Sequence, residues 1–192
     1  MSGGEIGFIG FGDLGKALHK LLPGFGARIR VFDPWLPDGT LRDHGVEPAS
    51  LETVLSSSDV IFVVASVTSD NGGFLGAKEF ARMRRNASFV LLSRAGVVDF
   101  DALMAAVRSG RIRAASDVYP EEPLPPDHPV RNLDGFILSA HRAGALDVAF
   151  KQMGRMVLED MALMTRRLPP VTCRRAERET VRRMRSKPVS RN

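Results

Sequence analysis

Cysteine is almost absent from this 192-residue chain, which holds only Cys173, and long apolar runs are absent altogether. A single cysteine excludes an internal disulfide, and nothing has the spacing of a zinc cluster, so no metal site is expected. No apolar run is long enough to span a bilayer, and the first residues lack the basic and apolar regions of a signal peptide. We therefore expect a soluble protein of the reducing cytoplasm. The neighbouring Arg174 and Arg175 would lower the pKa of Cys173, but we interpret it as an incidental surface thiol.

The basic C-terminal end has no aromatic residue, although it carries most of the positive charge. Residues 166–192 hold ten lysines and arginines against two glutamates, so the net charge of +5 leaves the preceding residues slightly acidic. Proteins that bind nucleic acid combine a basic surface with aromatic side chains that stack on bases. Nucleic-acid binding is therefore not expected. The tail is predicted to be solvated, or to pack against another lobe.

Short β-branched apolar runs alternate with amphipathic stretches along the chain, which predicts a doubly wound, mostly parallel sheet of the α/β class. The predicted strands are residues 5–10, 27–33, 59–65, 88–93, 112–118 and 135–140. The predicted helices are residues 13–25, 50–58, 99–110 and 147–164. In the first helix, Leu14, Leu18, Leu21 and Leu22 are expected on one face, with Pro23 ending it. In the second, Ser50 is the expected N-cap.

The first predicted strand leads into Gly10-Phe11-Gly12-Asp13-Leu14-Gly15, a G-x-G-x-x-G motif that opens a helix. In this context Gly10 allows the tight turn, Gly12 lets a pyrophosphate approach the backbone, and Gly15 permits close packing of helix on strand. Asp13 and Leu14 form the helix N-terminus that faces the phosphates. The pattern predicts a Rossmann dinucleotide site.

The second predicted strand ends at Asp33, about twenty residues after the glycine motif. A carboxylate there accepts hydrogen bonds from the ribose hydroxyls and repels a 2′-phosphate, so NAD is expected in preference to NADP. Trp35 is expected to cap the adenine side or to pack on the surface. Arg28 and Arg30 alternate with apolar residues and are interpreted as edge or face residues, not as phosphate ligands.

Three polar residues, Arg94, Glu122 and His141, follow the last three predicted strands. A guanidinium can bind an anionic substrate group, an imidazole can exchange a proton with a hydroxyl or carbonyl oxygen, and a carboxylate can orient the imidazole. The set is typical of hydride-transfer chemistry. Only one of the adjacent Glu121 and Glu122 can face His141, and Glu122, directly before Pro123, is preferred. The other histidines, His19, His44 and His128, are interpreted as surface or structural residues.

Together these segments resemble the D-isomer-specific 2-hydroxyacid dehydrogenases, over roughly residues 5–170. The matching stretches are GFIGFGDLGKAL, VFDPW, SRAGVVDFDAL, ASDVYPEEPLPPDHPV and SAHRAGA. The resemblance implies an NAD-dependent oxidoreductase in which Arg94 binds the substrate carboxylate, Glu122 and His141 form the acid–base pair, and Asp117 contacts the nicotinamide carboxamide. It also assigns cofactor contacts to Thr68, Ser93, Arg94, His141 and Gly144.

The sequence departs from the family pattern at two places on the cofactor-facing wall. Residues 64–67 stand where the family has H-x-P before Thr68, and Leu91 and Leu92 replace the small residues before Ser93 and Arg94. The hydrogen bonding of the nicotinamide pocket is therefore expected to differ in detail, while each catalytic group is present.

The resemblance implies a nucleotide-binding domain over residues 1–168, a basic tail over residues 169–192, and homodimerisation through the nucleotide-binding lobe. Family members have a substrate lobe, mostly ahead of the glycine motif, whereas the first strand here begins at Glu5. We therefore expect the substrate lobe to be absent and the chain to be a fragment of a longer enzyme that acts on a 2-hydroxy or 2-keto acid. The alternative is a non-enzymatic NAD(H)-binding sensor of the corepressor kind. A β-hydroxyacid dehydrogenase would need a catalytic lysine, and none ends a predicted strand.

Overall fold

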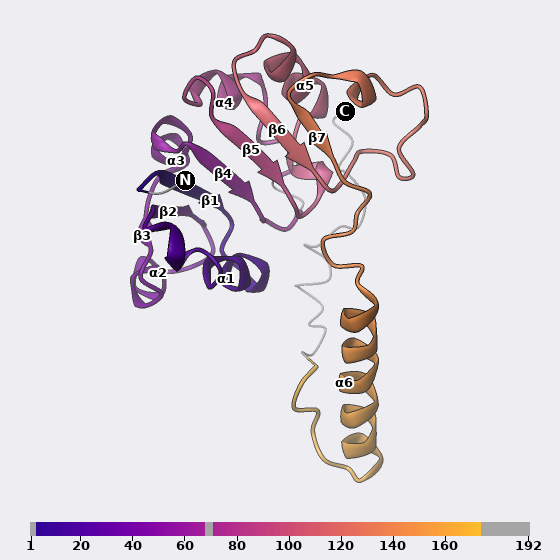
Figure 1. Cartoon of the computed structure of the whole chain (residues 1–192). Helices are drawn as coiled ribbons and strands as arrows, with labels where there is room; N and C mark the ends of the chain where they lie inside the picture. Colours follow the sequence, from indigo (N-terminus) through magenta and orange to yellow (C-terminus); the bar gives the residue numbers. More distant parts are fainter. Residues whose placement is uncertain (1–2, 68–70, 174–192) are drawn as a thin grey trace.

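The computed structural model describes residues 3–67 and 71–173. Its centre is a seven-stranded sheet in the order β3-β2-β1-β4-β5-β6-β7, with every neighbouring pair parallel (Figure 1). The strands are β1 (Glu5–Ile9), β2 (Arg28–Phe32), β3 (Glu47–Pro48), β4 (Val60–Val63), β5 (Ser88–Leu91), β6 (Arg113–Ser116) and β7 (Phe136–Leu138). The predicted doubly wound α/β sheet is confirmed, and all six predicted strands are present.

Helices connect the strands, as crossovers between parallel strands require. They are α1 (Asp13–His19), α2 (Asp38–Asp43), α3 (Leu51–Ser57), α4 (Ala77–Arg82), α5 (Phe100–Arg108) and α6 (Asp147–Thr165). Three 3-10 turns, Pro23–Phe25, Ala95–Val97 and Pro129–Asn132, complete the regular structure of the described residues. Among these helices none is both long and apolar enough to cross a membrane.

Two apolar cores form on the two faces of the sheet. Helices α3, α4 and α5 bury residues such as Val54, Phe80 and Leu103 against the larger core. On the other face, Leu22 and Leu41, from the segments around α1 and α2, pack with Phe8 in the smaller core. Burial is nearly complete in the central strand β1, whereas Ile137 of the edge strand β7 is 72% exposed. The carboxyl ends of such parallel strands can form a crevice.

Three short elements, β3, α2 and α4, are not among the predicted ones. Strand β3 has only two residues, and α2 buries a single side chain, Leu41, so neither gives a periodic apolar signal. Helix α4 also buries one side chain, Phe80. The predicted N-cap of α3 is present, since the Ser50 hydroxyl accepts a hydrogen bond from the Thr53 amide at 3.1 Å.

The predicted leucine face of α1 is wrong at two of its four positions. Leu14 is 46% exposed and Leu21 is 74% exposed, whereas Leu22 is buried. The helix ends at His19, and the Leu21 and Leu22 amides then donate to the carbonyls of Leu18 and His19, which tightens the chain into a 3-10 turn. That turn directs Leu21 into solvent. Leu14 lies in the first turn of α1, within the glycine motif.

Arg28 and Arg30 lie at the β2–β3 edge of the sheet, as predicted. The Arg30 guanidinium pairs with the Glu5 carboxylate at 2.6 Å and with Glu47 at 3.4 Å, and Arg28 pairs with Glu47 at 3.6 Å. These ion pairs occupy both guanidiniums with neighbouring carboxylates of β1 and β3. Neither arginine lies at the carboxyl end of β2, where the crevice forms.

Two histidines enclose the side chain of Phe11, which belongs to the glycine motif. The rings of His19 and His44 each lie 5.8 Å from the Phe11 ring, in edge contacts. Burial lowers the pKa of His19 below its ordinary value, and the neighbouring His44 lowers it further. His128 is structural as well, because its Nδ1 accepts a hydrogen bond from the Val130 amide at 3.2 Å.

Acidification from about pH 7.5 to about pH 5.5 is expected to lower the melting temperature of the chain, and His19→Gln to reduce that loss. Because the pKa of His19 is lower in the folded than in the unfolded chain, folding releases protons below about pH 6.5, and stability falls as pH falls. Thermal unfolding at both pH values, followed by circular dichroism, measures the effect. An equal loss in the unmutated chain and in His19→Gln would contradict it.

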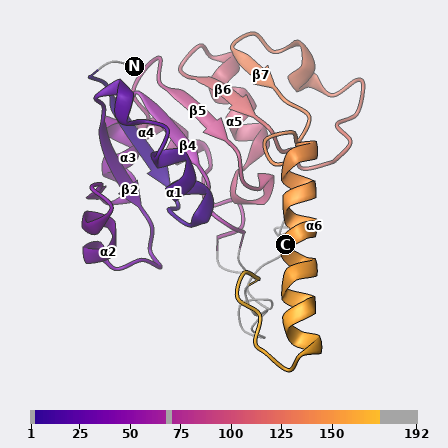
Figure 2. The ribbon, with the colours of Figure 1, turned by 60° about the horizontal axis from the view of Figure 1, so that its bottom comes forward.

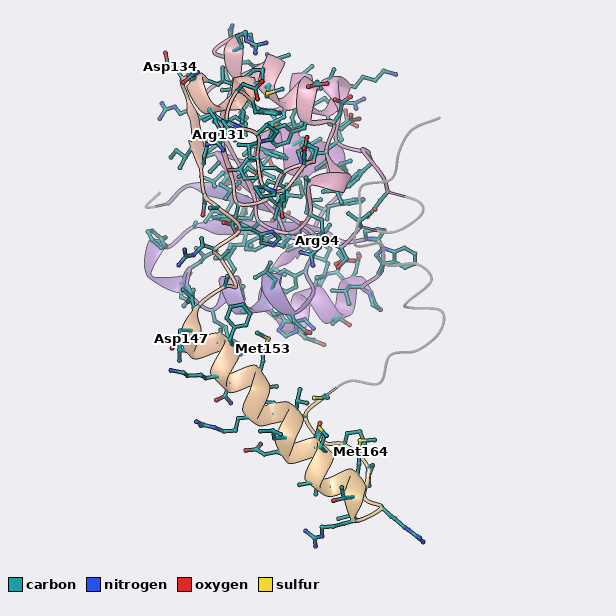
Figure 3. The ribbon with its side chains drawn as sticks, turned by 90° about the vertical axis from the view of Figure 1, so that its right-hand side faces the viewer. Arg94, Arg131, Asp134, Asp147, Met153 and Met164 are labelled. Carbon is teal, nitrogen blue, oxygen red and sulfur yellow. The ribbon has the colours of Figure 1, made fainter. Side chains whose placement is uncertain are left out.

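Helix α6 extends away from the sheet, and the figures show it separated from the other helices (Figures 1 and 2). It spans Asp147–Thr165, against the predicted 147–164, and most of its large apolar side chains are exposed. These include Met153 and Met164, both labelled in Figure 3. After the helix the chain turns back, and the buried Asp160 carboxylate accepts hydrogen bonds from the amides of Val171, Thr172 and Cys173.

The interpretation of Cys173 as an exposed thiol is confirmed, whereas Arg174 and Arg175, which could lower its pKa, lie outside the described residues. A hydrogen bond to the Asp160 carboxylate raises the pKa of the Cys173 thiol, because the thiolate would face a negative charge. Asp160 is charged over the working pH range, since hydrogen bonds from the Cys173 and Val171 amides lower its pKa to about 2. The thiol is therefore expected to react slowly.

Asp160→Asn is expected to increase the reaction rate of Cys173 with a disulfide reagent several-fold at about pH 8. The substitution removes the charge that disfavours the thiolate, which is the reacting species. The absorbance of the released thiol reports the rate, and Glu159→Gln serves as the control on the same helix. A rate that Asp160→Asn leaves unchanged would contradict the assignment.

Candidate functional site

The three predicted catalytic residues follow three adjacent strands. Because β5, β6 and β7 are parallel neighbours, their carboxyl ends share one edge of the sheet. Arg94 follows β5, Glu122 follows β6 and His141 follows β7. This edge is where open α/β sheets bind ligands. Figure 3 shows Arg94 within the body of the molecule, while α6 extends away from it.

His141 and Glu122 form a hydrogen-bonded ion pair. His141 Nδ1 lies 2.7 Å from Glu122 Oε2, and both side chains are partly exposed. The other carboxylate oxygen, Oε1, accepts the Tyr119 amide at 2.9 Å, so the backbone fixes the carboxylate. A carboxylate that accepts a hydrogen bond from Nδ1 favours the tautomer in which Nε2 is the reacting nitrogen. The preference for Glu122 over Glu121 as the partner of His141 is therefore confirmed, while the catalytic roles stay predictions.

Arg94 begins the loop after β5 with its side chain exposed. Its guanidinium donates a hydrogen bond to the Ser93 carbonyl at 2.8 Å, which leaves most of its five N–H donors for other partners. The residues that follow, Ala95–Val97, form a buried 3-10 turn that holds the loop against the larger core. A rigid loop with an exposed guanidinium can present two parallel donors to a carboxylate.

Asp117 is buried at the end of β6, where it binds the loop that carries His141. Its two carboxylate oxygens accept hydrogen bonds from the Arg142 and Ala143 amides at 2.7 and 2.8 Å. Burial alone would raise the pKa of Asp117, but a hydrogen bond from the Ser139 side chain, the two amides and the nearby His141 lower it overall. In the described residues Asp117 therefore holds backbone amides. The predicted contact with a nicotinamide carboxamide stays untested.

The glycine motif has the three geometries that a dinucleotide needs. Gly10 has φ = +88°, and a Cβ there would lie 2.6 Å from the Ala65 Cα. Gly12 has open space where its Cβ would project, so a phosphate group can approach the backbone. A Cβ on Gly15 would lie 3.2 Å from the Gly10 carbonyl, which shows how closely α1 packs on the turn. Asp13 and Leu14 belong to the first turn of α1, where backbone N–H groups have no partner within the helix.

Asp33 lies beside the glycine motif, directly after β2. Its Oδ2 accepts the Phe11 amide at 2.8 Å and its Oδ1 accepts the Trp35 amide at 2.9 Å. Each oxygen keeps a further lone pair, so the carboxylate can still accept ribose hydroxyls. A cavity of about 350 Å³ is lined by Asp33, Asp38 and Leu41, among others, and Trp35 is 58% exposed nearby in sequence.

A larger cavity, of about 480 Å³, lies at the amino end of β2, whereas Asp33 follows its carboxyl end. His19, Arg28 and Glu47 are among its lining residues, and none of the predicted site residues lines it. The smaller cavity beside Asp33 is therefore the one that belongs to the predicted cofactor site.

The remaining predicted cofactor residues divide into three cases. Ser93 is buried, and its hydroxyl has no hydrogen-bond partner among the described residues, which fits a polar group that a bound ligand satisfies. Gly144 is exposed in the loop that Asp117 holds. Thr68 lies outside the described residues. The residues of this site thus fit NAD at the phosphate loop, at the ribose carboxylate and at the buried Ser93 hydroxyl.

Two residues that contact this site, Tyr119 and Ser139, were not predicted from the sequence. The Tyr119 hydroxyl lies 2.9 Å from the Ser116 carbonyl and 2.8 Å from the Ser139 carbonyl. A signal was present, because Tyr119 is the only tyrosine of the chain and comes two residues after Asp117. Ser139 likewise comes two residues before His141.

Comparisons with known proteins identify the family of this chain. The family described as "D-isomer specific 2-hydroxyacid dehydrogenase, NAD binding domain" matches residues 1–143. A glyoxylate reductase of Korarchaeum cryptofilum is 34% identical over 170 residues, which cover 88% of this chain and 51% of that protein. A D-3-phosphoglycerate dehydrogenase of Archaeoglobus fulgidus is 32% identical over 170 residues, covering 88% of this chain and 32% of its own length.

A solved structure gives the same result. The crystal structure of a phosphoglycerate oxidoreductase from Rhizobium etli is 72% identical, with a TM-score of 0.79, and covers 88% of this chain and 54% of its own. The chain therefore spans at most about half the length of these relatives. Since the family match covers most of the chain and includes the glycine motif, Arg94, Glu122 and His141, the chain belongs to the D-isomer-specific 2-hydroxyacid dehydrogenase family and contains its NAD-binding domain.

Proposed function

We propose that this chain provides the NAD-binding part and the catalytic residues of an oxidoreductase that interconverts a 2-hydroxy acid and a 2-keto acid. The observation that carries the proposal is the His141–Glu122 pair, at 2.7 Å, on the sheet edge that also presents Arg94. An oriented imidazole and an exposed guanidinium on the same sheet edge suit a substrate with an exchangeable C2 oxygen and a carboxylate.

Each residue has a separate role in this proposal. Arg94 binds and orients the substrate carboxylate and polarises the neighbouring keto group. His141 Nε2 gives a proton to the C2 oxygen during reduction and removes it during oxidation, and Glu122 stabilises the imidazolium. Bound NAD supplies the hydride acceptor, and NADH the hydride donor. The cofactor contacts are assigned to the glycine motif, Asp33, Thr68, Ser93, Asp117 and Gly144.

The relatives bear the names of enzymes for glyoxylate, phosphoglycerate and glycerate, which are all small 2-hydroxy or 2-keto acids. We place the substrate of this chain in the same class. Residues 1–168 are proposed as the dinucleotide-binding domain and residues 169–192 as a basic tail. A cytoplasmic location and a homodimer complete the proposal, in line with the single, unpaired cysteine and the family resemblance.

NADH titration of the 192-residue chain, followed by calorimetry, tests the cofactor site, and a chimera tests the chemistry. In the chimera, this chain replaces the matching 54% of the Rhizobium etli oxidoreductase, and the rest of that protein is kept. With a panel of 2-keto acids, the chimera is expected to oxidise NADH at least about 1,000-fold faster than the chain alone, because positioning in a closed crevice contributes that much.

Arg94→Ala in the chimera is expected to reduce kcat/KM at least about 100-fold, since the substrate carboxylate and the developing charge lose their partner. Arg108→Ala, at the end of α5, is the matched control and should have no effect. NADH binding without any turnover by the chimera would favour the non-enzymatic sensor. Turnover by the chain alone, abolished by Arg94→Ala, would show that the chain completes its own site.

A further inference from the structure

Tyr119 connects the two loops that carry His141 and Glu122. Its hydroxyl lies 2.9 Å from the Ser116 carbonyl, at the end of β6, and 2.8 Å from the Ser139 carbonyl, just after β7. Its backbone amide donates to Glu122 Oε1 at 2.9 Å. Tyr119 therefore binds the Glu122 carboxylate directly. It also holds Ser139, which lies two residues before His141 in the same loop.

The Tyr119 side chain is fixed by packing. It is 7% exposed, and its ring lies 6.0 Å from the ring of Phe100, in an edge contact within the larger core. Burial raises the pKa of Tyr119, so its hydroxyl keeps the proton and remains a donor at neutral pH. Since a hydroxyl has one proton, the two carbonyls share it. The result is a rigid donor placed between the ends of β6 and β7.

Besides the Tyr119 hydroxyl, several hydrogen bonds restrain the loop that begins at Ser139, and one of them runs from the Ser139 side chain to the Asp117 carboxylate. The Ser139 amide donates to the Ser116 carbonyl at 3.0 Å, and Asp117 holds the Arg142 and Ala143 amides beyond His141. His141 itself has φ = +54°, a conformation that non-glycine residues seldom adopt. The direction of its side chain thus depends on the anchors on either side, and the Tyr119 hydroxyl belongs to the anchor before it.

We propose that Tyr119 is a positioning residue, whose hydroxyl holds the His141 loop so that the imidazole stays hydrogen-bonded to Glu122. The proposal rests on the proposed function, because it assigns Tyr119 to the acid–base pair of that reaction. A phenylalanine would keep the packing against Phe100 but would leave the Ser139 carbonyl without the hydroxyl donor. The imidazole would then move relative to Glu122, and small displacements of an acid–base group reduce rates strongly.

The first test compares the unmutated chain with Tyr119→Phe and needs neither substrate nor turnover. At about pH 8, the nitrogen chemical shifts of His141, read through its non-exchanging ring protons, report the fraction of the tautomer protonated on Nδ1. His141→Gln identifies the signals, and Glu122→Ala, which removes the acceptor oxygens, gives the reference for a lost pair. In Tyr119→Phe the shifts are expected to move at least half of the way toward that reference.

A structural control separates positioning from general loosening. Val130→Ala removes buried atoms near this region, and it should lower the melting temperature by as much as Tyr119→Phe or more while the His141 shifts stay unchanged. If Tyr119→Phe leaves the His141 shifts at their unmutated values, the proposal is wrong. Equal changes in Val130→Ala would also overturn it, because the effect would then follow stability alone.

A second variant covers the case in which Tyr119→Phe does not fold. Since Tyr119 is the only tyrosine, growth on difluorotyrosine alters this hydroxyl alone and makes it more acidic without changing its position. The His141 shifts should then change as the phenol loses its proton, and unchanged shifts through that titration would reject the proposal.

A kinetic measurement links the inference to the reaction. In the chimera, Tyr119→Phe is expected to lower kcat about tenfold while KM for NADH stays within about twofold, since the hydroxyl acts on the acid–base pair and not on cofactor binding. An inactive chimera would reject the proposed function. The His141 chemical shifts would then decide alone whether Tyr119 positions the imidazole. An active chimera with unchanged kcat in Tyr119→Phe would reject the role of Tyr119 alone.

Discussion

Gly10→Ala is expected to unfold at a markedly lower temperature than the unmutated chain and to lose measurable NADH binding. Gly10 has φ = +88°, and an added Cβ would lie 2.6 Å from the Ala65 Cα and 2.7 Å from the Ala65 nitrogen. These atoms are backbone at the end of β4, so they cannot rotate away. A strained residue costs about 1–3 kcal/mol by itself, and the clash adds to it.

Gly12→Ala is the matched control for Gly10→Ala, because it adds the same methyl group two residues away. No atom lies within 4 Å of the position of its Cβ, so the melting temperature should change little. The methyl group would occupy the space through which a phosphate approaches the backbone, and NADH affinity should fall at least about tenfold. Thermal unfolding and calorimetry of both variants measure these effects. A stable, NADH-binding Gly10→Ala protein would refute the assigned turn.

The sheet could be predicted from the sequence because its central strands are short apolar runs that pack into the two cores. Strands β1, β4 and β5 each gave one such run. Strand β3 has two residues and pairs with β2. Its formation depends on this pairing, which the local sequence around β3 does not reveal. The same limit explains Leu21, which follows the helical spacing but lies outside the core because α1 ends at His19.

The candidate site divides in the same way. The positions of Arg94, Glu122 and His141 after adjacent strands follow from parallel topology, so their common edge could be predicted. The contacts of Asp117 with the Arg142 and Ala143 amides could not, because they depend on the path of a loop 25 residues away. Hydrogen bonds to backbone atoms leave no mark on side-chain periodicity. The two-carbonyl contact of the Tyr119 hydroxyl was missed for the same reason.

The unmutated chain is expected to bind NADH about 10- to 100-fold more tightly than NADPH, and Asp33→Asn to narrow that ratio about tenfold. The Asp33 carboxylate ends β2 beside the cavity of about 350 Å³, where it would face the ribose of the adenosine. A 2′-phosphate at that position meets a like charge, whereas two hydroxyls meet an acceptor. Asparagine keeps an acceptor oxygen and removes the charge, so the affinity for NADPH should rise.

Asp33→Ala should narrow the ratio of NADH to NADPH affinity and should also weaken the binding of both cofactors. Comparison with Asp33→Asn thus separates cofactor selection by the Asp33 charge from support of the phosphate loop by the Asp33 carboxylate. The Phe11 amide of the glycine motif donates to Asp33 Oδ2 at 2.8 Å, so alanine removes a support of the phosphate loop along with the charge. Asp38→Ala is the matched control, since Asp38 lines the same cavity. Calorimetry gives the affinities, and the fluorescence of Trp35, the only tryptophan, gives an independent signal close to Asp33. Equal affinities of the unmutated chain for NADH and NADPH would show that Asp33 supports the loop without selecting the cofactor.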